Sequence, residues 1–251
     1  TPSVSSVYVL NCLFNKCTVT SGNGGALYLS TSVTYFFVES SSFFSCKTNS
    51  GEGGAIYFSN SNALQSVLYS VCVNDCSSNN KSPFARIIIQ NSPSNKNYVN
   101  YSTIARCVDE TLNAQSMFYI DYGKIYCPSV NMSMNSCRLY SGIIYGPSVN
   151  SSSVTSLLSY STFANNSASE YNCIWCNTGG ANYEIKCCNI LRNTQVSSSY
   201  GIIFARGNLM IKDSCILENT ANYIFYQEST SYTITLSNCT VDKTTYNQNL
   251  I

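Results

Sequence analysis

The sequence GGALY at residues 24–28 recurs as GGAIY at residues 53–57, an offset of 29 residues. Phe14 and Cys17 recur as Phe43 and Cys46 at the same offset. Two different motifs that repeat with one period are the signature of a repeat architecture, in which each repeat is one structural unit. This repeat decides the fold, and it extends well beyond these two copies.

The second motif is an apolar residue followed three positions later by Cys or Asn, and it continues along the chain. Its copies are Phe14/Cys17, Phe43/Cys46, Val73/Cys76, Ile104/Cys107, Met134/Cys137, Phe163/Asn166, Ile190/Asn193 and Ile216/Asn219, with a degenerate ninth at Val241/Thr244. Successive apolar members are 25 to 31 residues apart. Five residues before each of them lies another mostly apolar residue, and Ser129 is the exception in that column.

Each period holds about three short β-rich segments separated by turns of Gly, Ser and Asn. The apolar stripe with a 3.6-residue period that marks an amphipathic helix is missing. Short strands stacked on the equivalent strands of the next repeat form a solenoid. The sequence therefore predicts an all-β fold, a right-handed parallel β-helix of about nine coils with three short strands in each. We expect one domain over residues 1–251, which can itself be a fragment of a longer solenoid.

The Cys and Asn members of the motif are predicted to form a structural ladder, one residue in each coil. Its members are Cys17, Cys46, Cys76, Cys107, Cys137, Asn166, Asn193 and Asn219. Stacked amides can hydrogen-bond to one another, and stacked cysteines can be buried thiols, cross-coil disulfides or metal ligands. Buried thiols are favoured because parallel, in-register side chains point the same way. The glycines of the GGA motif are expected to permit a positive φ or a close backbone approach at a corner.

These motifs carry a resemblance to a known group of proteins. GGA at residues 24–26 and 53–55, together with Phe-x-x-Asn at residues 163–166, resembles the repeats of polymorphic outer-membrane-type autotransporter passengers. Similar repeats occur in protist surface proteins, trichomonad ones among them. Here Cys often replaces Asn, and GGA becomes Ser-Gly-Ile at residues 141–143 and Tyr-Gly-Ile at residues 200–202. The resemblance implies a parallel β-helix displayed on a cell surface.

Composition favours an extracellular protein. Charged residues make up 10% of the chain and its net charge is +1, so no basic surface for nucleic acid is expected. The sequence contains no run of about 20 apolar residues, so no membrane span is predicted. Fourteen cysteines are compatible with an oxidising compartment. Six Asn-x-Ser/Thr sequons are candidates for N-glycosylation, at Asn80, Asn100, Asn131, Asn150, Asn165 and Asn238.

No catalytic, cofactor-binding or metal-binding residues are predicted, and we do not expect an enzyme. The chain has no histidine, which removes the Ser-His-Asp and Cys-His constellations. The acids are dispersed, and Asp109-Glu110 is the only adjacent pair. Cys173 and Cys176, followed by Cys187 and Cys188, superficially suggest a zinc site. The repeat instead assigns these four cysteines to ordinary coil positions.

Tyrosine is the residue type with most binding potential. Five tyrosines at related repeat positions form a candidate ligand face: Tyr28, Tyr57, Tyr119, Tyr145 and Tyr226.

The favoured function is a non-catalytic surface or structural protein that presents a rigid solenoid for adhesion, with self-assembly end to end. Its partners would be further copies of itself, other surface proteins or glycans. The alternatives are a carbohydrate-binding module that uses the tyrosine face, and a divergent polysaccharide lyase or hydrolase.

Overall fold

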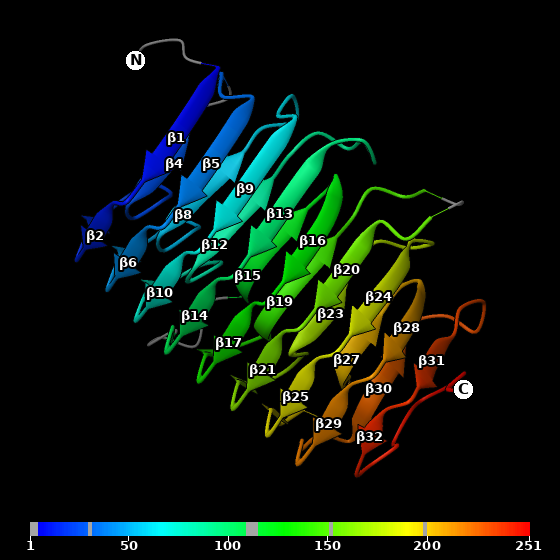
Figure 1. Ribbon diagram of the computed structural model, residues 1–251. Coiled ribbons are helices and arrows are strands. Elements are labelled where there is room, and N and C mark those ends of the chain that lie inside the picture. The colour runs from blue at the N-terminus through cyan, green and yellow to red at the C-terminus, as the bar shows by residue number, and fades with distance from the viewer. Residues whose placement is uncertain (1–4, 30–31, 109–114, 151–152, 198–199) are drawn as a thin grey trace.

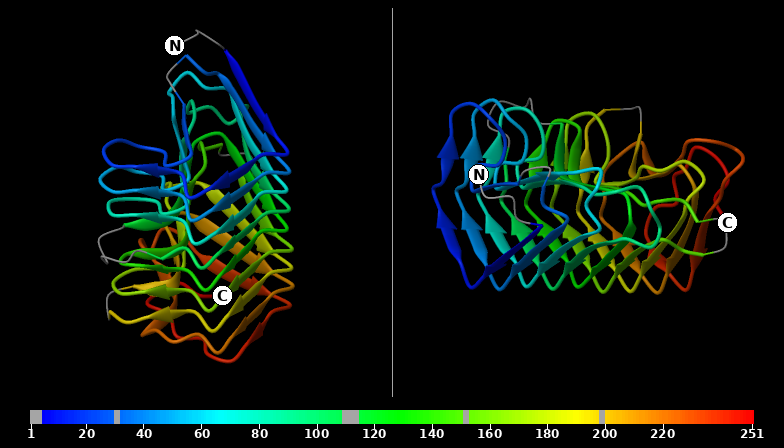
Figure 2. Two further views of the ribbon diagram at one scale, coloured as in Figure 1. Left: turned by 90° about the vertical axis from the view of Figure 1, so that its left-hand side faces the viewer. Right: turned by 90° about the horizontal axis from the view of Figure 1, so that it is seen from above.

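The computed structural model describes residues 5–29, 32–108, 115–150, 153–197 and 200–251. Over these residues the chain contains 32 strands and no helix, and every strand pair is parallel. The strands wind into a parallel β-solenoid, in which equivalent strands of successive coils lie side by side (Figure 1). Figure 2 shows the coils stacked one beside the next, with the two ends of the chain at opposite ends of the stack.

Two of the three long sheets contain nine strands each. Sheet 1 consists of β1 (Ser6–Leu10), β5 (Tyr35–Glu39), β9 (Gln65–Tyr69), β13 (Lys96–Asn100), β16 (Lys124–Pro128), β20 (Ser156–Ser159), β24 (Asn182–Lys186), β28 (Asn208–Lys212) and β31 (Ile234–Ser237). Sheet 2 consists of β2 (Leu13–Asn15), β6 (Ser42–Phe44), β10 (Cys72–Asn74), β14 (Thr103–Ala105), β17 (Asn131–Ser133), β21 (Thr162–Ala164), β25 (Asn189–Leu191), β29 (Cys215–Leu217) and β32 (Thr240–Val241).

The third long sheet has eight strands. Sheet 3 consists of β4 (Leu27–Leu29), β8 (Ile56–Ser59), β12 (Ala85–Ile88), β15 (Ser116–Asp121), β19 (Tyr140–Gly146), β23 (Ile174–Cys176), β27 (Gly201–Ala205) and β30 (Tyr223–Gln227). Two short sheets lie between sheets 2 and 3 along the chain. They consist of β3 (Thr18–Val19), β7 (Lys47–Thr48) and β11 (Ser77–Ser78), and of β18 (Ser136–Cys137), β22 (Ser167–Ala168) and β26 (Thr194–Gln195).

The chain makes about eight full turns, because all three long sheets are continuous over eight coils and two of them extend into a ninth. The predicted all-β parallel solenoid with three principal strands in each coil is therefore confirmed. Alternate residues of each strand point inward, and they form one hydrophobic core along the whole stack. Phe14 and Phe43, for example, stack with their ring centroids 4.8 Å apart.

The register corrects the predicted alignment of the fifth coil. Ile104 of β14 pairs with Met132 of β17, and Met132 pairs with Phe163 of β21, so Met132 and not Met134 is the buried apolar member. In sheet 1, Cys127 takes the inward position that had been assigned to Ser129. Both corrections are the same shift of two residues. Met134 and Ser129 instead occupy corners of the coil, with φ of 57° and 56°.

Such left-handed corners recur in every coil. The corner between sheets 1 and 2 has a positive φ at each of nine residues: Asn11, Ser40, Ser70, Tyr101, Ser129, Tyr160, Cys187, Asp213 and Asn238. The corner after sheet 2 has a positive φ at each of eight residues: Lys16, Ser45, Asp75, Arg106, Met134, Asn165, Arg192 and Glu218. L-residues rarely adopt this conformation. Its repetition shows that the stack of coils, and not local preference, imposes the corner.

The GGA motif performs both of the predicted roles, one for each glycine. Gly24 and Gly53 have φ of 68° and 72°, a conformation that glycine adopts without steric cost. Gly25 and Gly54 allow close approach of neighbouring coils. A Cβ on Gly54 would lie 2.1 Å from the carbonyl oxygen of Pro83 and 2.3 Å from that of Ser77.

Candidate functional site

The outward face of sheet 3 carries a column of large side chains, one from each strand. The register places them in line: Tyr28, Tyr57, Arg86, Tyr119, Ile144, Trp175, Phe204 and Tyr226. Four of the tyrosines predicted to share a face, Tyr28, Tyr57, Tyr119 and Tyr226, belong to this column. Sequence comparison of the repeats missed the other members, because they are not tyrosines.

Tyr145 does not belong to the outward column, which is a correction to the predicted face. It pairs with Ile120 on one side and Cys176 on the other, points inward and is fully buried. Cys176 Sγ donates to its hydroxyl at 3.1 Å. Ile144 takes the outward position, since neighbouring residues of a strand face opposite sides of the sheet.

A second aromatic column lies beside the first at the C-terminal half of sheet 3. Tyr140 and Tyr171 are stacked with centroids 5.2 Å apart, and Tyr171 lies 4.8 Å from Tyr200. The two columns touch, because Tyr140 lies 4.4 Å from Trp175 and Tyr200 lies 5.2 Å from Tyr226. We call this surface the aromatic face; it comprises Tyr140, Tyr171, Trp175, Tyr200, Phe204, Tyr223 and Tyr226. Of these, Phe204 is only 3% exposed, because neighbouring rings pack against it. The second column of this face has a sequence signal that was missed: a Tyr precedes Ile144, Trp175 and Phe204 by four residues each time.

At the N-terminal edge of the aromatic face, the surface of sheet 3 is hollowed. The hollow has a volume of about 270 Å³. It is lined by Lys81, Arg86, Gln115, Ser116, Tyr119, Tyr140, Ile144, Trp175 and Asn177. Ile144, only 5% exposed, and the three aromatic rings are its apolar part. The lining includes two cations and no carboxylate.

The two cations of the hollow are held by one acid and one ring. Glu52 contacts Arg86 Nε at 3.0 Å and Lys81 Nζ at 3.3 Å. The guanidinium of Arg86 lies over the ring of Tyr119, with Cζ 4.5 Å from the ring centroid. Glu52 carries one negative charge against these two positive ones, and the neighbouring carboxyl of Asp121 adds a second when it is ionised. The cation–π contact and the ion pair together fix the position of the guanidinium.

Asp121 lies next to the hollow, under Tyr119. The Tyr119 hydroxyl donates to Asp121 Oδ2 at 3.1 Å. Gly146 of the next coil leaves room for this carboxylate, since a Cβ there would lie 2.1 Å from Asp121 Oδ1. Burial raises the pKa of the Asp121 carboxyl to about 6, against the opposing effects of the Tyr119 hydrogen bond and of Arg86. Burial also raises the pKa of Tyr119.

The indole N–H of Trp175 is buried and donates to no acceptor among the described residues. Nearly all buried polar groups in folded proteins have a partner. Leaving such a donor unpaired costs about 1–3 kcal/mol. The hollow therefore contains one side chain whose hydrogen-bonding capacity is unused.

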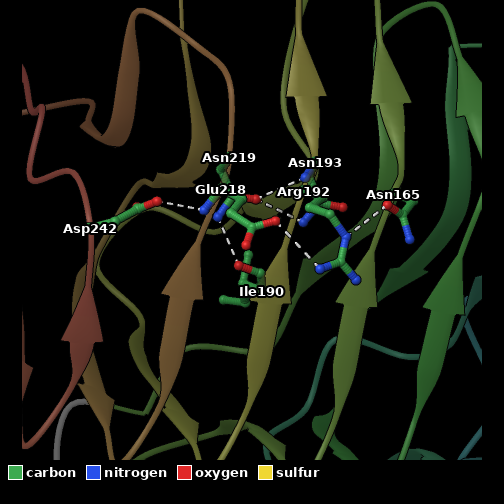
Figure 3. Close-up of polar contacts among 7 residues, drawn as sticks. All are labelled: Asn165, Ile190, Arg192, Asn193, Glu218, Asn219 and Asp242. Atoms are coloured by element: carbon green, nitrogen blue, oxygen red, sulfur yellow. Dashed lines mark hydrogen bonds and ion pairs between the residues drawn. The ribbon is translucent and has the colours of Figure 1, made fainter.

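The predicted structural ladder exists on the other side of the solenoid, after sheet 2. Asn166, Asn193 and Asn219 are fully buried, and each donates from Nδ2 to a carbonyl of the preceding coil. Asn193 also donates from both its backbone N and its Nδ2 to Asn219 Oδ1, at 2.9 and 3.0 Å. Figure 3 shows the bonds from Asn193 to Asn219 and from Asn219 to Ile190, beside a second, exposed row in which Arg192 bonds to Asn165 and Glu218.

The cysteine half of the ladder needs one correction. Cys17, Cys46, Cys76 and Cys107 occupy the column, but the next member is Asn135 and not Cys137. Asn135 Nδ2 donates to Asn166 Oδ1 at 3.0 Å. Cys137 lies two residues further along, in β18, where it pairs with Ala168. This is the same two-residue shift in the alignment of the fifth coil that places Met132, and not Met134, in the core.

None of the fourteen cysteines is paired in a disulfide, and all of them lie within the described residues. Cys173 and Cys176 are buried in or beside β23, and Cys187 and Cys188 lie at the corner between β24 and β25. In the described part of the chain, no three cysteine or acidic side chains come together as a metal site. Asp109 and Glu110 lie outside the described residues.

The six sequons are placed unevenly. Asn80, Asn131, Asn165 and Asn238 are exposed, whereas Asn100 and Asn150 are half-buried. The side-chain oxygen of Asn100 is buried without a hydrogen-bond partner. The residues that complete the Asn150 sequon, 151 and 152, lie outside the described residues. Within the described ranges, no helix is long and apolar enough to cross a membrane.

This geometry defines the chain as a parallel β-solenoid with an aromatic face and an adjoining cationic hollow. Comparison with models of known protein families matched none, and searches of curated proteins and of solved structures also found no match. Aromatic rings and fixed donors at a shallow hollow are suited to binding a ligand.

Proposed function

We propose that this chain is a non-catalytic extracellular adhesion protein, whose rigid solenoid presents the aromatic face to carbohydrate. The observation that supports it most is the pair of touching aromatic columns on sheet 3. Sugar rings stack on aromatic side chains through their apolar faces, and a solenoid holds such side chains at a fixed spacing. The resemblance of the repeats to those of surface proteins and the exposed sequons support the extracellular location.

A rigid support is what a repeated binding surface needs. Five rings of the aromatic face stand on strands that are hydrogen-bonded to their neighbours, and the core beneath them is continuous. The other two, Tyr171 and Tyr200, lie in the segments that lead into β23 and β27. Rings held in this way lose little side-chain entropy when a ligand binds. A polysaccharide that follows the columns would contact several coils in succession, so modest contacts would add up along its length.

A glycan array probed with the purified chain tests this proposal. We expect binding to one class of glycans and a loss of signal in Tyr171→Ala and Tyr200→Ala, which remove rings from the aromatic face. Tyr69→Ala is the matched control, because Tyr69 is 41% exposed at the end of β9 in sheet 1, on another side of the solenoid. Absence of binding to any glycan, or equal losses in all three variants, would count against the proposal.

A second function, assembly end to end, has its own observation. The strands β1, β2 and β4 are the outermost strands of their sheets, and Leu13 and Tyr8 of this first coil are 65% and 58% exposed. Such an edge can be continued by another coil, from the same polypeptide or from a second copy. Negative-stain electron microscopy would show filaments if copies stack. A Leu13→Lys variant would then give single short rods, whereas monomers of the unmodified chain at high concentration would exclude this function.

A further inference from the structure

We propose that the hollow lined by Arg86, Tyr119 and Trp175 binds the carboxylate of an acidic sugar, at the edge of the aromatic face. This inference rests on the proposed carbohydrate binding and specifies its ligand. It identifies the ligand by chemistry, as a pyranose that carries a carboxylate. Uronic acids and sialic acids are the two sources of that chemistry.

Charge is the first argument. Lys81 and Arg86 line the hollow and no carboxylate lines it, whereas the carboxyl groups of Glu52 and the buried Asp121 lie beside it. The side chain of Arg86 is only 20% exposed and that of Lys81 33%, so water screens them less than ordinary surface cations. An anionic group placed in the hollow would meet the two cations at its surface, because both carboxyl groups lie outside its lining.

The orientation of Arg86 is the second argument. Glu52 occupies Nε of the guanidinium at 3.0 Å, and the ring of Tyr119 lies at 4.5 Å from its Cζ. A guanidinium held in this way keeps N–H groups whose fork geometry matches a planar carboxylate. Arg86 is therefore the residue that would recognise the acid.

The shape and lining of the hollow are the third argument. Its volume of about 270 Å³ is below the roughly 300–1,000 Å³ of clefts that hold drug-sized ligands, which suits one sugar ring. Tyr119, Tyr140 and Trp175 provide rings, and Ile144 provides an apolar floor. Gln115 and Asn177 provide polar groups for hydroxyls. The rest of a longer glycan would continue onto Tyr171 and Tyr200.

The experiment uses Trp175, which lines the hollow and is the only tryptophan of the chain, so fluorescence excited at wavelengths that tyrosine does not absorb reports on this residue. The chain is titrated with trigalacturonic acid, with 3′-sialyllactose and with neutral lactose. We expect a saturable change in fluorescence with at least one acidic sugar and at least about tenfold weaker binding of lactose, since lactose lacks the charge-assisted hydrogen bond. The response to the first two sugars distinguishes uronic from sialic acid.

Three variants assign the response to the cation cluster. Arg86→Gln should weaken binding of the acidic sugar at least about tenfold, because the charged donor is lost. Glu52→Gln should strengthen it about two- to fivefold, because the competing acid is removed. Arg192→Gln is the matched control, since it makes the same change at a residue paired with Glu218 beyond sheet 2, and should bind normally. Thermal unfolding of each variant establishes that it is folded.

The outcomes separate this inference from the proposed function. Equal binding of lactose and the acidic sugars, or unchanged binding by Arg86→Gln and Glu52→Gln, would overturn the acidic-sugar assignment and leave carbohydrate binding in place. A stronger response to a sulfated heparin tetrasaccharide than to both carboxylated sugars would also overturn it. No response to any of these sugars, together with an empty glycan array, would overturn both.

Discussion

The backbone N–H of Cys107 donates to Oδ1 of Asn135 in the next coil at 3.0 Å, and this bond joins the cysteine column to the asparagine ladder. On one side of it, Cys46 and Cys76 donate from Sγ to carbonyls of the preceding coil at 3.6 Å. On the other side, Asn166 donates from Nδ2 to Met132 O at 2.9 Å. Cysteine therefore reproduces one bond of the ladder, whereas asparagine also bonds to the next coil.

The first prediction concerns Asn193, whose amide bonds to both neighbouring coils. Its Nδ2 donates to Phe163 O at 2.8 Å and to Asn219 Oδ1, and its Oδ1 accepts from Asn166. Asn193→Ala leaves buried donors and acceptors unpaired, so we expect a loss of about 2–4 kcal/mol in the free energy of unfolding. Urea denaturation measures this loss. Asn189→Ala, at an exposed position of β25, should change the free energy of unfolding by less than about 0.5 kcal/mol. Equal losses in the two variants would show that the ladder does not stabilise the fold.

The second prediction concerns the close approach of coils at Gly54. A Cβ there would lie 2.1 Å from Pro83 O, a distance that requires the backbone to move. Gly54→Ala should therefore lower the free energy of unfolding by about 3 kcal/mol or more. At Gly179, the nearest atom to an added Cβ is Arg206 O at 3.8 Å, so Gly179→Ala should be nearly neutral. Thermal unfolding of the two variants measures this difference in stability. A Gly54→Ala protein as stable as the unmodified chain would show that the coils can separate there.

The sequence predicted the architecture because a solenoid repeats its chemistry in register. The inward columns, the ladder positions of Cys107 and Asn166, and the roles of the GGA glycines all follow from the period. The fifth coil was misaligned because Met134/Cys137 and Met132/Asn135 satisfy the same spacing of three residues. The wrong pair gave more even coil lengths. Evenness is a poor guide, since surface loops accept insertions at little thermodynamic cost.

The site was less predictable than the fold. Ile144 and Tyr145 differ by one position in the chain but face opposite sides of sheet 3, and a register irregularity between β15 and β19 precedes them. The hollow depends on residues from separate coils, such as Lys81, Arg86 and Trp175, which share no motif. Only the stacking of coils brings them together.

The third prediction concerns the reactivity of the cysteines. Burial raises the pKa of Cys127, Cys173 and Cys176 to about 12, so at pH 8 these thiols are not ionised and do not attack alkylating reagents. Cys12 and Cys72 are exposed. In brief treatment of the native chain with iodoacetamide, mass spectrometry should find label on Cys12 and Cys72 and not on the buried three. Labelling of all five at similar rates before denaturation would contradict the buried positions.

The fourth prediction concerns N-glycosylation, which tests the proposed location. Asn131, Asn165 and Asn238 are exposed and accessible to a glycosyltransferase. Asn100 is half-buried with its amide oxygen enclosed, so it should remain unmodified. Glycopeptide mass spectrometry of protein from its native source should show glycans at one or more of the three exposed sites. Unmodified asparagine at all three would argue against passage through a glycosylating secretory pathway, and a glycan on Asn100 would contradict its burial.

The fifth prediction concerns the pH dependence of stability. The pKa of Asp121 is raised to about 6 in the folded chain, chiefly by burial, and returns to about 3.8 on unfolding. Between these values the folded state binds more protons than the unfolded state, so stability falls as pH rises from about 4 to 6 and is then constant. A shift of this size corresponds to at most about 3 kcal/mol.

Asp121→Asn isolates this contribution, because asparagine cannot ionise and keeps a similar shape. Urea denaturation at intervals between pH 3.5 and 7.5 should show the fall in the unmodified chain and a flatter profile in the variant. At pH 7 the variant should be the more stable of the two, unless the lost hydrogen bond from Tyr119 to the charged carboxylate outweighs the relief of burial. The difference between the two profiles is therefore the decisive quantity. Parallel profiles would show that Asp121 has an ordinary pKa and that water reaches it under Tyr119.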